Sequence, residues 1–330
     1  MHIRKKIPKV SICIPTYNQG KFIRETIESA INQDFDDYEI VISNNQCTDD
    51  TDLIVRSFQS NKIKYIVQPR HLPIMTQNWN ACVKASNGKY VCLLSSDDVL
   101  NPNFLYEQVH LLEKYPKVAF AHSAVELIDE QGKTIGLEKS IHPSFVRDGT
   151  KEFLRYIWGP KCVLVSVLFR RDLFNIVGGF DERYHIVGDW ALWLKLLKYG
   201  GVAYNEKVLA KYRVYTTSAR GSSKEKIMHC KERFKLLDET FSNWPKHVPY
   251  NDKLREKVMR SFALSTLTAA VEVSDQSERK LLISLALSKS NSFRVRLKAN
   301  LINQGFGPVI SFTNKAKWHL RQWVKKILYP

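Results

Sequence analysis

Closely spaced cysteines and long apolar runs are both missing from this 330-residue sequence. None of its six cysteines forms a C-x-x-C pair, which argues against a structural zinc site. No stretch approaches the roughly 18 consecutive apolar residues of a membrane-spanning helix. The apolar run Val10–Ile14, which Pro15 ends, is too short for the core of a signal peptide. Thiols within apolar runs suit a reducing compartment, so we expect a cytoplasmic protein.

Acidic residues are absent from one end of the chain. Between Arg279 and Pro330 there are 11 basic residues and no Asp or Glu. Residues 219–330 carry 22 basic against 9 acidic residues, whereas residues 1–218 carry 28 against 24. We therefore predict a nearly neutral globular domain at 1–218 and a basic region at 219–330. The formal charge of +17 calls for an anionic partner, such as a nucleotide, a nucleic acid or an acidic lipid.

The first hundred residues alternate short apolar runs with longer amphipathic ones. Four runs are typical of buried strands: Val10–Ile14, Glu39–Ile42, Ile63–Val67 and Tyr90–Leu94. The segments between them show helical spacing, with apolar positions at Phe22, Ile23, Ile27, Ala30 and Ile31, at Leu53, Ile54 and Phe58, and over Met75–Ala85. This alternation predicts a parallel sheet with helices on both faces, whose strands end at one common edge.

The pattern changes after Asp98. We expect a helix from Pro102 to about Tyr115 and a turn at Asp129–Gly132. Further strands are expected at Val118–His122, Val125–Ile128, Val163–Phe169 and Val208–Val214, with a helix at Trp190–Tyr199. This half, residues 101–218, reads as a mixed sheet added to a nucleotide-binding half at 1–100. From Ser222 onward the pattern predicts mostly helices.

Polar clusters follow three of the predicted strands. They are Pro15-Thr16-Tyr17-Asn18, the loop from Asn44 to Asp49, and Ser95-Ser96-Asp97-Asp98. Because parallel strands end at the same edge of a sheet, we expect all three clusters at that edge, where ligands of such sheets bind.

Asp97 and Asp98 place two adjacent carboxylates at the end of a buried strand. The two charges repel each other, and a divalent cation would relieve that repulsion, since Mg²⁺ and Mn²⁺ favour oxygen ligands and bridge to phosphates. An N-cap is the alternative, because Asp ahead of Asn101-Pro102 suits the start of a helix.

Asp189 begins an amphipathic segment, Gly188-Asp-Trp-Ala-Leu-Trp193. A helix cap is one interpretation. The other is a general base, because a carboxylate beside two tryptophans is partly desolvated and therefore more basic.

Taken together, these segments resemble the family 2 glycosyltransferases of the GT-A fold. The likeness covers about residues 8–218, and each motif is short, but five occur in order. They are Val10–Asn18, Ser43–Thr51, Asn78–Asp98, the pair Gly178–Glu182 and Gly188–Trp193, and Tyr212-Arg213. The resemblance implies a Rossmann-like, mostly parallel α/β sheet flanked by helices, a mixed sheet on the acceptor side and a helical basic C-terminal extension.

The resemblance also implies roles for individual residues. Asp189 would deprotonate the acceptor hydroxyl, and Asp98 would hold Mn²⁺ or Mg²⁺ on the diphosphate of a nucleotide-sugar, with inversion at the sugar. Asp181 and Trp190 would contact the acceptor. Donor-binding residues would be Pro15, Thr16, Tyr17, Asn18, Asn44, Asp97 and Arg213, with Thr16, Tyr17 and Asn44 around the base and ribose and Asp97 facing the ribose.

Four positions depart from the family pattern. Asn44 stands where Asp is common, Ser95 where the metal motif has its first acidic residue, Gly188 where Glu is frequent, and Tyr215 where His is frequent. An amide brings no charge, so the nucleotide base is less constrained, although a UDP-sugar is favoured. The chain also has no Gln-x-x-Arg-Trp segment, so we expect single additions rather than processive synthesis.

The segment 315–329 has apolar residues at helical spacing, and four of its basic residues, Lys317, Arg321, Lys325 and Lys326, fall largely on other faces. This profile suits a helix lying on an anionic membrane, and it also suits a terminal helix that packs on the core. No recognisable nucleic-acid module is present, so we expect no nucleic-acid partner.

The expected function is sugar transfer to a glycan or a polyprenyl-diphosphate-linked acceptor, in the synthesis of a surface polysaccharide of O-antigen or capsule type. Such an enzyme would be cytoplasmic and peripheral to the membrane. Two alternatives stay open. One is a binding module for nucleotides or glycans that has lost activity. The other is a nucleotidyltransferase, although only Gly20 follows the first strand, where that class needs a glycine-rich loop.

Overall fold

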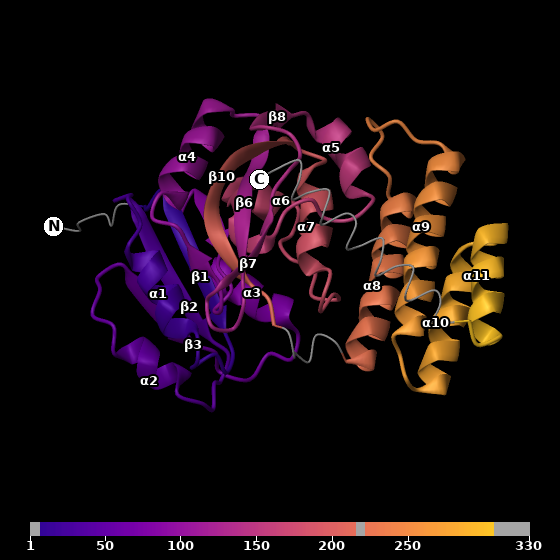
Figure 1. Ribbon diagram of the computed structural model, residues 1–330. Coiled ribbons are helices and arrows are strands. Elements are labelled where there is room, and N and C mark those ends of the chain that lie inside the picture. The colour runs from indigo at the N-terminus through magenta and orange to yellow at the C-terminus, as the bar shows by residue number, and fades with distance from the viewer. Residues whose placement is uncertain (1–6, 216–221, 307–330) are drawn as a thin grey trace. The chain divides into compact units, whose positions relative to one another are not determined.

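The computed structural model describes residues 7–215 and 222–306 of the chain. Two compact units divide it, Met1–Thr216 and Thr217–Pro330 (Figure 1). The first holds a ten-stranded sheet with the order β3-β2-β1-β4-β9-β6-β10-β5, and β7 and β8 pair with β6 and β10. The predicted membrane-surface helix at 315–329 lies outside the described residues.

The first half of the sheet is parallel, as the sequence predicts. Its strands are β1 (Val10–Thr16), β2 (Tyr38–Asn44), β3 (Ile63–Val67) and β4 (Tyr90–Leu93), joined through α1 (Ile23–Ile31), α2 (Thr51–Arg56) and α3 (Met75–Lys84). Side chains alternate between the two faces. Ile12 and Ile14 pack with α1, whereas Cys13 contacts Ser86 just after α3. Leu53, expected on the inner face of α2, is 70% exposed, and Val55 is buried there instead.

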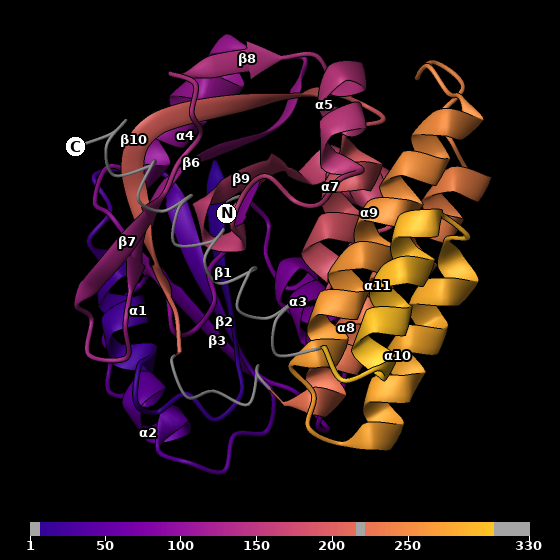
Figure 2. The same ribbon diagram turned by 45° about the vertical axis from the view of Figure 1, so that its right-hand side comes forward.

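The second half of the sheet is mixed (Figure 2). It contains β5 (Val99–Leu100), β6 (Val118–Ile128), β7 (Thr134–Glu138), β8 (Phe145–Arg147), β9 (Val167–Arg170) and β10 (Gly201–Arg213). Its helices are α4 (Phe104–Lys114), α5 (Gly149–Tyr156), α6 (Arg171–Ile176) and α7 (Gly188–Leu196). The GT-A-like layering predicted from the sequence is therefore present: one sheet with helices on its faces.

Three predicted elements differ. The strand expected at Val208–Val214 begins at Gly201, as β10. The two strands expected at Val118–His122 and Val125–Ile128 form the single strand β6. The strand expected at Val163–Phe169 begins instead as a turn of 3₁₀-helix at Leu164–Ser166, and only its second part joins the sheet as β9. Ser166 causes this break, because its hydroxyl and its N–H both bond back to the carbonyl of Val163.

Strand directions bring the ends of distant segments to one edge. β9 runs antiparallel to both β4 and β6, so β4 and β6 point the same way, and β10 is parallel to β6. The carboxyl ends of β1, β2, β4, β6 and β10 therefore share one edge of the sheet, and the loop that leads into β9 arrives at the same edge.

The second unit consists, in its described part, of α8 (Ser223–Ser242), α9 (Asp252–Val271), α10 (Gln276–Lys289) and α11 (Phe293–Asn303). Each begins with a side chain that accepts a hydrogen bond from a backbone N–H of the first turn, namely Ser222, Asn251, Asp275 and Ser292. Gly305, with φ of +90°, follows the end of α11.

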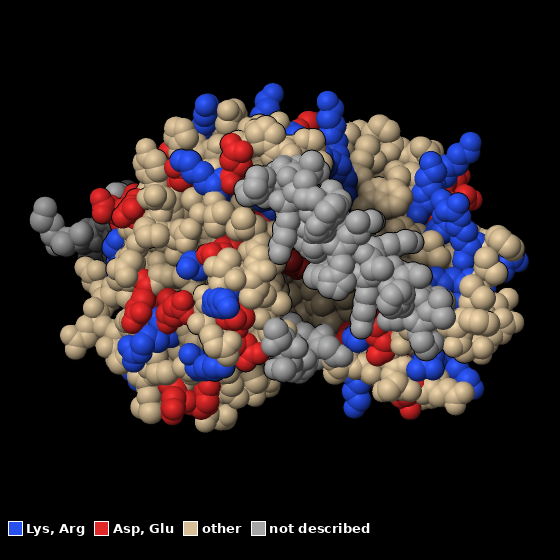
Figure 3. All heavy atoms as spheres, viewed as in Figure 1, with Lys and Arg blue, Asp and Glu red and all other residues tan. Residues whose placement is uncertain are grey.

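Charge differs between the units. Residues 222–306 carry 16 basic against 9 acidic residues, and Figure 3 shows Lys and Arg side chains along the helices of this unit. On the first unit the two signs are interspersed in the same view. Among the described residues no helix is both long and apolar enough to cross a membrane.

Candidate active site

The Asp97-Asp98 pair lies in a tight turn just after β4. The Asp98 N–H donates to the carbonyl of Ser95, and the Asp98 carbonyl accepts from the Thr26 hydroxyl of α1 at 2.8 Å. Oδ1 of Asp98 accepts from the backbone N–H of Arg213 at 2.8 Å. The turn is thus held from α1 and from the end of β10, and both carboxylates are buried, Asp97 at 7% and Asp98 at 2% exposure.

The helix-cap interpretation of this pair does not hold. Helix α4 starts at Phe104 with Asn103 at its N-cap position, several residues beyond Asp98. The two carboxylates therefore do not serve α4, and another reason is needed for two adjacent acidic side chains at this edge.

Arg213 lies behind the turn. Its guanidinium donates to the carbonyl of Asp97 at 2.8 Å, to the carbonyl of Asp129 at 2.9 Å and to the Glu25 carboxylate at 2.6 Å. The side chain is 1% exposed and covers the ring of Phe22. All three nitrogens of the side chain are engaged by the protein, which argues against direct contact with a diphosphate. The geometry favours a structural role in holding Asp97.

Tyr215, two residues after Arg213, contacts the same turn. Its hydroxyl donates to Oδ2 of Asp97 at 2.6 Å, and its ring packs edge-on against Phe22 with centroids 5.8 Å apart. From the sequence alone, this position is only a departure from the family pattern. Nothing in the sequence indicates that this hydroxyl would select Asp97.

Several hydrogen bonds join the loop after β1 to the loop after β2. Asn18, at φ of +49°, accepts from the Thr48 N–H at 2.8 Å through its side chain, and its own N–H donates to Sγ of Cys47. Asp49 accepts from the Gly20 N–H at 2.9 Å. The predicted donor segment Pro15–Asn18 is therefore fixed against the 44–49 loop.

Thr16 and Tyr17 differ in what they offer a ligand. Thr16 is 1% exposed, and within the described residues its hydroxyl has no hydrogen-bond partner. Tyr17 is 46% exposed and packs against His71 with ring centroids 4.6 Å apart and the ring planes tilted by 45°. An orphaned hydroxyl beside an exposed aromatic ring suits a polar ligand with a planar base.

Asn44 is buried and its amide is engaged at both ends. The amide N–H group donates to the Tyr65 hydroxyl at 2.6 Å, and the oxygen accepts from the Cys47 N–H at 2.7 Å. Tyr65 in turn donates to Asp52. Asn44 therefore shapes the loop, and its direct contact with a nucleotide stays a prediction.

Asp189 occupies the first turn of α7, one residue inside the helix. Oδ1 accepts from the N–H of Trp190 at 2.6 Å, and the side chain is only partly exposed. Desolvation raises the pKa of this carboxyl from 3.8 to about 6, against the lowering effect of the backbone hydrogen bonds. A carboxylate with a pKa near 6 is ionised at neutral pH and is a better proton acceptor than an ordinary Asp.

The segment before Asp189 is packed closely against α3. A Cβ built on Gly188 would lie 2.4 Å from Cγ2 of Thr76, and the hydroxyl of Thr76 donates to the carbonyl of Tyr184. This contact explains why residue 188 is glycine where the family often has Glu.

The predicted acceptor residues have other roles here. Oxygens of Asp181 pair with Arg183 at 2.9 and 2.7 Å, which lowers the pKa of the Asp181 carboxyl. Trp190 is 2% exposed, and its indole N–H donates to the carbonyl of Tyr156 at 2.7 Å. The indole therefore belongs to the core, and its burial argues against contact with a sugar.

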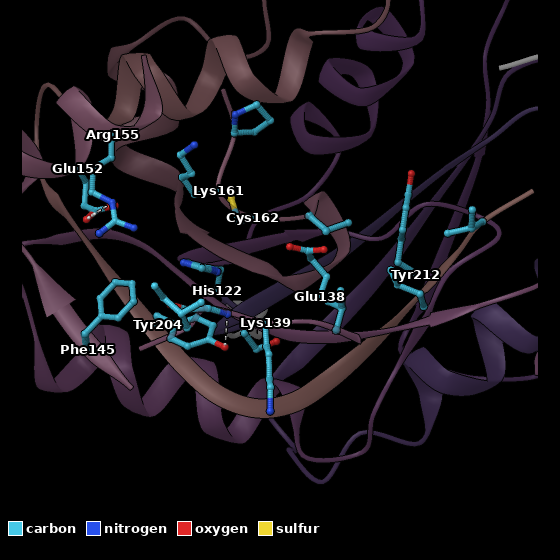
Figure 4. A pocket seen from close by; sticks show the side chains of 18 residues that line it. His122, Glu138, Lys139, Phe145, Glu152, Arg155, Lys161, Cys162, Tyr204 and Tyr212 are labelled. Carbon is cyan, nitrogen blue, oxygen red and sulfur yellow. Dashed lines mark hydrogen bonds and ion pairs between the residues drawn. The ribbon is translucent and has the colours of Figure 1, made fainter. Parts of the chain in front are cut away.

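A cavity of about 620 Å³ opens beside β6 and β10 (Figure 4). Its walls include the loop Pro160–Val163, together with Arg155, His122 and Tyr204. The sequence alone points to the loop Pro160–Val163 as one that carries specificity, but it gives Arg155, His122 and Tyr204 no functional role. Basic residues on a short amphipathic helix look like a solvated face, and only the fold shows what they line.

The Asp97-Asp98 turn can take part in holding a divalent metal. Its carboxylate oxygens are the ligand type that Mg²⁺ and Mn²⁺ prefer. Within the described ranges, no three His, Cys, Asp or Glu residues gather closely enough to hold an ion by themselves. Such metals commonly bind through one or two carboxylates plus substrate phosphates, so the residues fit an ion that is shared with a diphosphate.

Comparison with known sequences gives three findings. The family model described as glycosyl transferase family 2 matches residues 11–177. An uncharacterized glycosyltransferase of Rickettsia felis is 31% identical over 239 residues, which is 71% of this chain and 38% of that protein. A Campylobacter jejuni GalNAc(5)-diNAcBac-PP-undecaprenol beta-1,3-glucosyltransferase is 27% identical over 63% of this chain and 66% of that protein.

Among solved structures, residues 1–349 of S. aureus TarS in complex with UDP-GlcNAc superpose with a TM-score of 0.58 at 16% identity, covering 90% of this chain and 92% of that one. This likeness confirms the GT-A type of fold. The chain spans well under half of the Rickettsia felis relative, so the fold and the family carry over but the activity of that whole protein does not.

Proposed function

This chain belongs to glycosyl transferase family 2, and from that premise we propose that it moves one sugar from a nucleotide-sugar to a glycan or lipid-linked acceptor with inversion. The family assignment sets aside the nucleotidyltransferase alternative. The observation that carries the proposal is the pairing of a desolvated carboxylate, Asp189, with a buried Asp97-Asp98 turn in one unit.

The donor would lie along the edge formed by the ends of β1, β2 and β4. The orphaned hydroxyl of Thr16 and the exposed ring of Tyr17 support a base and ribose there. Asp97, held by Tyr215, would face the ribose. A UDP-sugar is the favoured donor, and the UDP-GlcNAc in the TarS complex supports that choice by fold likeness alone.

In the proposed reaction, Asp189 accepts the proton of the acceptor hydroxyl while that oxygen attacks the anomeric carbon from the face opposite the diphosphate. The bond from that carbon to the diphosphate oxygen breaks in the same displacement, so the configuration inverts. Mn²⁺ or Mg²⁺, held by Asp98, would supply neutralisation of the charge that develops on the leaving diphosphate. The buried Asp97-Asp98 turn keeps its geometry because α1 and β10 hold it.

The acceptor is proposed to be a growing surface glycan on a polyprenyl diphosphate, of O-antigen or capsule type. The printed name of the Campylobacter jejuni relative, which contains PP-undecaprenol, supports this class. We further propose a cytoplasmic enzyme that contacts anionic membrane through 315–329. Cosedimentation of the full chain with vesicles rich in phosphatidylglycerol tests the membrane contact, and equal binding to neutral vesicles at low salt would count against it.

Nucleotide release tests the reaction. The full chain is incubated with UDP-, GDP- and dTDP-sugars, with Mn²⁺ or with EDTA, and free nucleoside diphosphate is measured alongside binding of the same nucleotides. Asp98→Ala and Asp189→Asn are compared with Asp36→Asn, an exposed carboxylate far along the chain from both.

We expect slow, metal-dependent release from one donor, lost in Asp98→Ala and kept in Asp36→Asn. Nucleotide binding without release, with an acceptor mixture or without it, would favour the alternative of a binding module that has lost activity. No nucleotide binding at all would contradict the proposed donor site.

A further inference from the structure

The cavity beside β6 and β10 is built entirely from the second half of the first unit. Its lining residues all fall between His122 and Val214. None comes from the strands and loops of residues 7–100, where the donor is proposed to bind. The cavity is therefore a candidate for the other substrate of a transferase.

Positive charge exceeds negative charge at one end of this cavity. A single buried carboxylate, Glu152 at 2% exposure, accepts from Arg147 at 3.2 Å and lies 3.5 Å from Arg155, both through Oε1. Lys161 stands close by and forms no ion pair with any described residue. Arg147 pairs with Glu152 from outside the lining, so the two lining cations, Arg155 and Lys161, share this end of the cavity with a single carboxylate that is already paired.

The environment of Lys161 agrees with this excess. Desolvation lowers the pKa of its ammonium, and the charge of Arg155 lowers that pKa further, against the raising effect of Glu152. Figure 4 shows Arg155 and Lys161 on the side of His122, whereas Glu138 lies toward Tyr212. An anion placed between Arg155 and Lys161 would relieve their mutual repulsion.

The neighbouring wall is aromatic and uncharged. His122 packs against Tyr204 with centroids 4.9 Å apart, and Tyr204 packs against Phe145 at 5.2 Å. Burial lowers the pKa of His122 to about 3, so the imidazole stays neutral at physiological pH. Aromatic walls beside a few placed polar groups are the usual lining of a site for a small organic ligand such as a sugar ring.

The cavity also adjoins the proposed base. Cys162 lines it, and the Tyr156 hydroxyl donates to Sγ of Cys162 at 3.4 Å. Burial raises the pKa of the Cys162 thiol, and the negative charge of Asp189 raises it further, which places Asp189 within electrostatic range. The carbonyl of Tyr156 also accepts from the indole N–H of Trp190, the residue after Asp189, so Tyr156 connects the cavity wall to the helix turn that carries the proposed base.

We propose that this cavity receives the acceptor and that Arg155 and Lys161 bind an anionic group on it, either a sugar carboxylate or a phosphate. That the bound glycan is the acceptor rests on the proposed function, whereas binding of an anionic glycoside in the cavity requires no turnover. The acceptor class is thereby narrowed to acidic glycans, those that carry uronic acids or sugar phosphates.

Direct binding to the full chain tests this inference. Methyl β-glucuronoside, methyl 6-phospho-β-glucoside and neutral methyl β-glucoside are titrated separately and followed by ligand-observed NMR. The double variant Arg155→Gln/Lys161→Gln is compared with Lys151→Gln, an exposed lysine on the same helix α5 that does not line the cavity. Thermal unfolding of each variant and its affinity for UDP report whether the fold and the donor site remain intact.

We expect at least one charged glycoside to bind about tenfold or more tightly than the neutral one, and to lose that advantage in the double variant but not in Lys151→Gln. Which charged probe binds tells a carboxylate from a phosphate. Equal affinity for all three, no saturable binding of either charged probe, or an equal loss in Lys151→Gln would overturn the inference. Failure of UDP to bind, with the charged glycosides still bound, would contradict the proposed function and leave the anionic site standing.

Discussion

The hydroxyl of Tyr215 donates a 2.6 Å hydrogen bond to Oδ2 of Asp97, and this joins the end of the described first unit to the turn after β4. Asp97 is thereby held from two directions, since Arg213 binds its backbone carbonyl. Tyr215 thus holds the carboxylate of Asp97, and Arg213, two residues earlier in the chain, holds the main-chain carbonyl of the same residue.

Tyr215→Phe should weaken donor binding more than it slows turnover. The variant keeps the ring contact with Phe22 but loses a hydrogen bond to a charged group. Asp97 then samples other rotamers, and we expect the KM for the donor to rise about 3- to 30-fold with a smaller change in kcat. Steady-state release of nucleoside diphosphate at varied donor concentrations measures both constants. Tyr199→Phe, at an exposed tyrosine, is the matched control, and an equal change in both variants would refute the positioning role.

Asp189→Asn should inactivate the enzyme by about 10²–10⁴-fold, the usual contribution of a general base. In the wild type, kcat/KM should rise with pH through an apparent pKa of about 6, since only the ionised carboxylate accepts a proton. A pH profile of donor-dependent transfer, flat between pH 5 and pH 7.5, would speak against Asp189 as the base.

The same substitution should stabilise the fold at neutral pH. The carboxyl has a raised pKa when folded, so ionisation disfavours the folded state: the penalty is absent below the unfolded value of 3.8, grows toward the folded value of about 6 and is complete above it. We expect Asp189→Asn to raise the free energy of unfolding by about 1–2 kcal/mol at pH 7.5 and by little at pH 4. Urea unfolding at the two pH values checks this, and a destabilised variant at pH 7.5 would contradict the desolvation argument.

Gly188→Ala should destabilise the first unit by about 1–3 kcal/mol, because the new methyl group meets Cγ2 of Thr76 at 2.4 Å. Thr76→Ser removes Cγ2 of Thr76 and keeps the hydroxyl that donates to the carbonyl of Tyr184. The double variant should therefore recover most of the loss. Thermal unfolding of the two single variants and the double variant gives the coupling, and strict additivity would show that the two groups do not meet.

Arg213→Lys should destabilise the protein by about 2–4 kcal/mol although it keeps the charge. A lysine cannot reproduce the three separate hydrogen bonds to Asp97, Asp129 and Glu25. Glu25→Gln should cost about 1 kcal/mol or less, since Glu25 is 53% exposed and its ion pair is screened by water. Equal losses in chemical denaturation would mean that the ion pair, and not the carbonyl contacts, holds Arg213.

The parallel half of the sheet was predictable because each strand is a short apolar run bounded by turn residues. β6 was predicted as two strands because His122 ends the first apolar run and Ser123 interrupts the pattern before Val125. Both are buried, at 4% each, inside a sheet that pairs β6 on both sides. Tertiary contacts therefore overrode a local polar break.

The motif spacing was enough to name Asp97, Asp98 and Asp189. Asp97 and Asp98 follow β4 at the edge where the parallel strands end, as predicted. Whether a side chain still has atoms to offer a ligand depends on contacts that no local pattern contains. Trp190 is occupied by Tyr156, and Arg213 by residues 84 to 188 positions away. The same holds for Lys161, whose charged neighbours Glu152 and Arg155 both come from α5.

The cavity walls carry one more consequence. β7 lies off the main strand order, and the loop before β9 carries no strand, whereas Asp98 and Arg213 are fixed by the pairing of β5 with β10. Residues in the β6–β7 hairpin and in the loop before β9 can be exchanged without shifting the register between β5 and β10. A lineage could therefore acquire a new acceptor by rewriting a few surface segments, and its donor chemistry would be inherited unchanged.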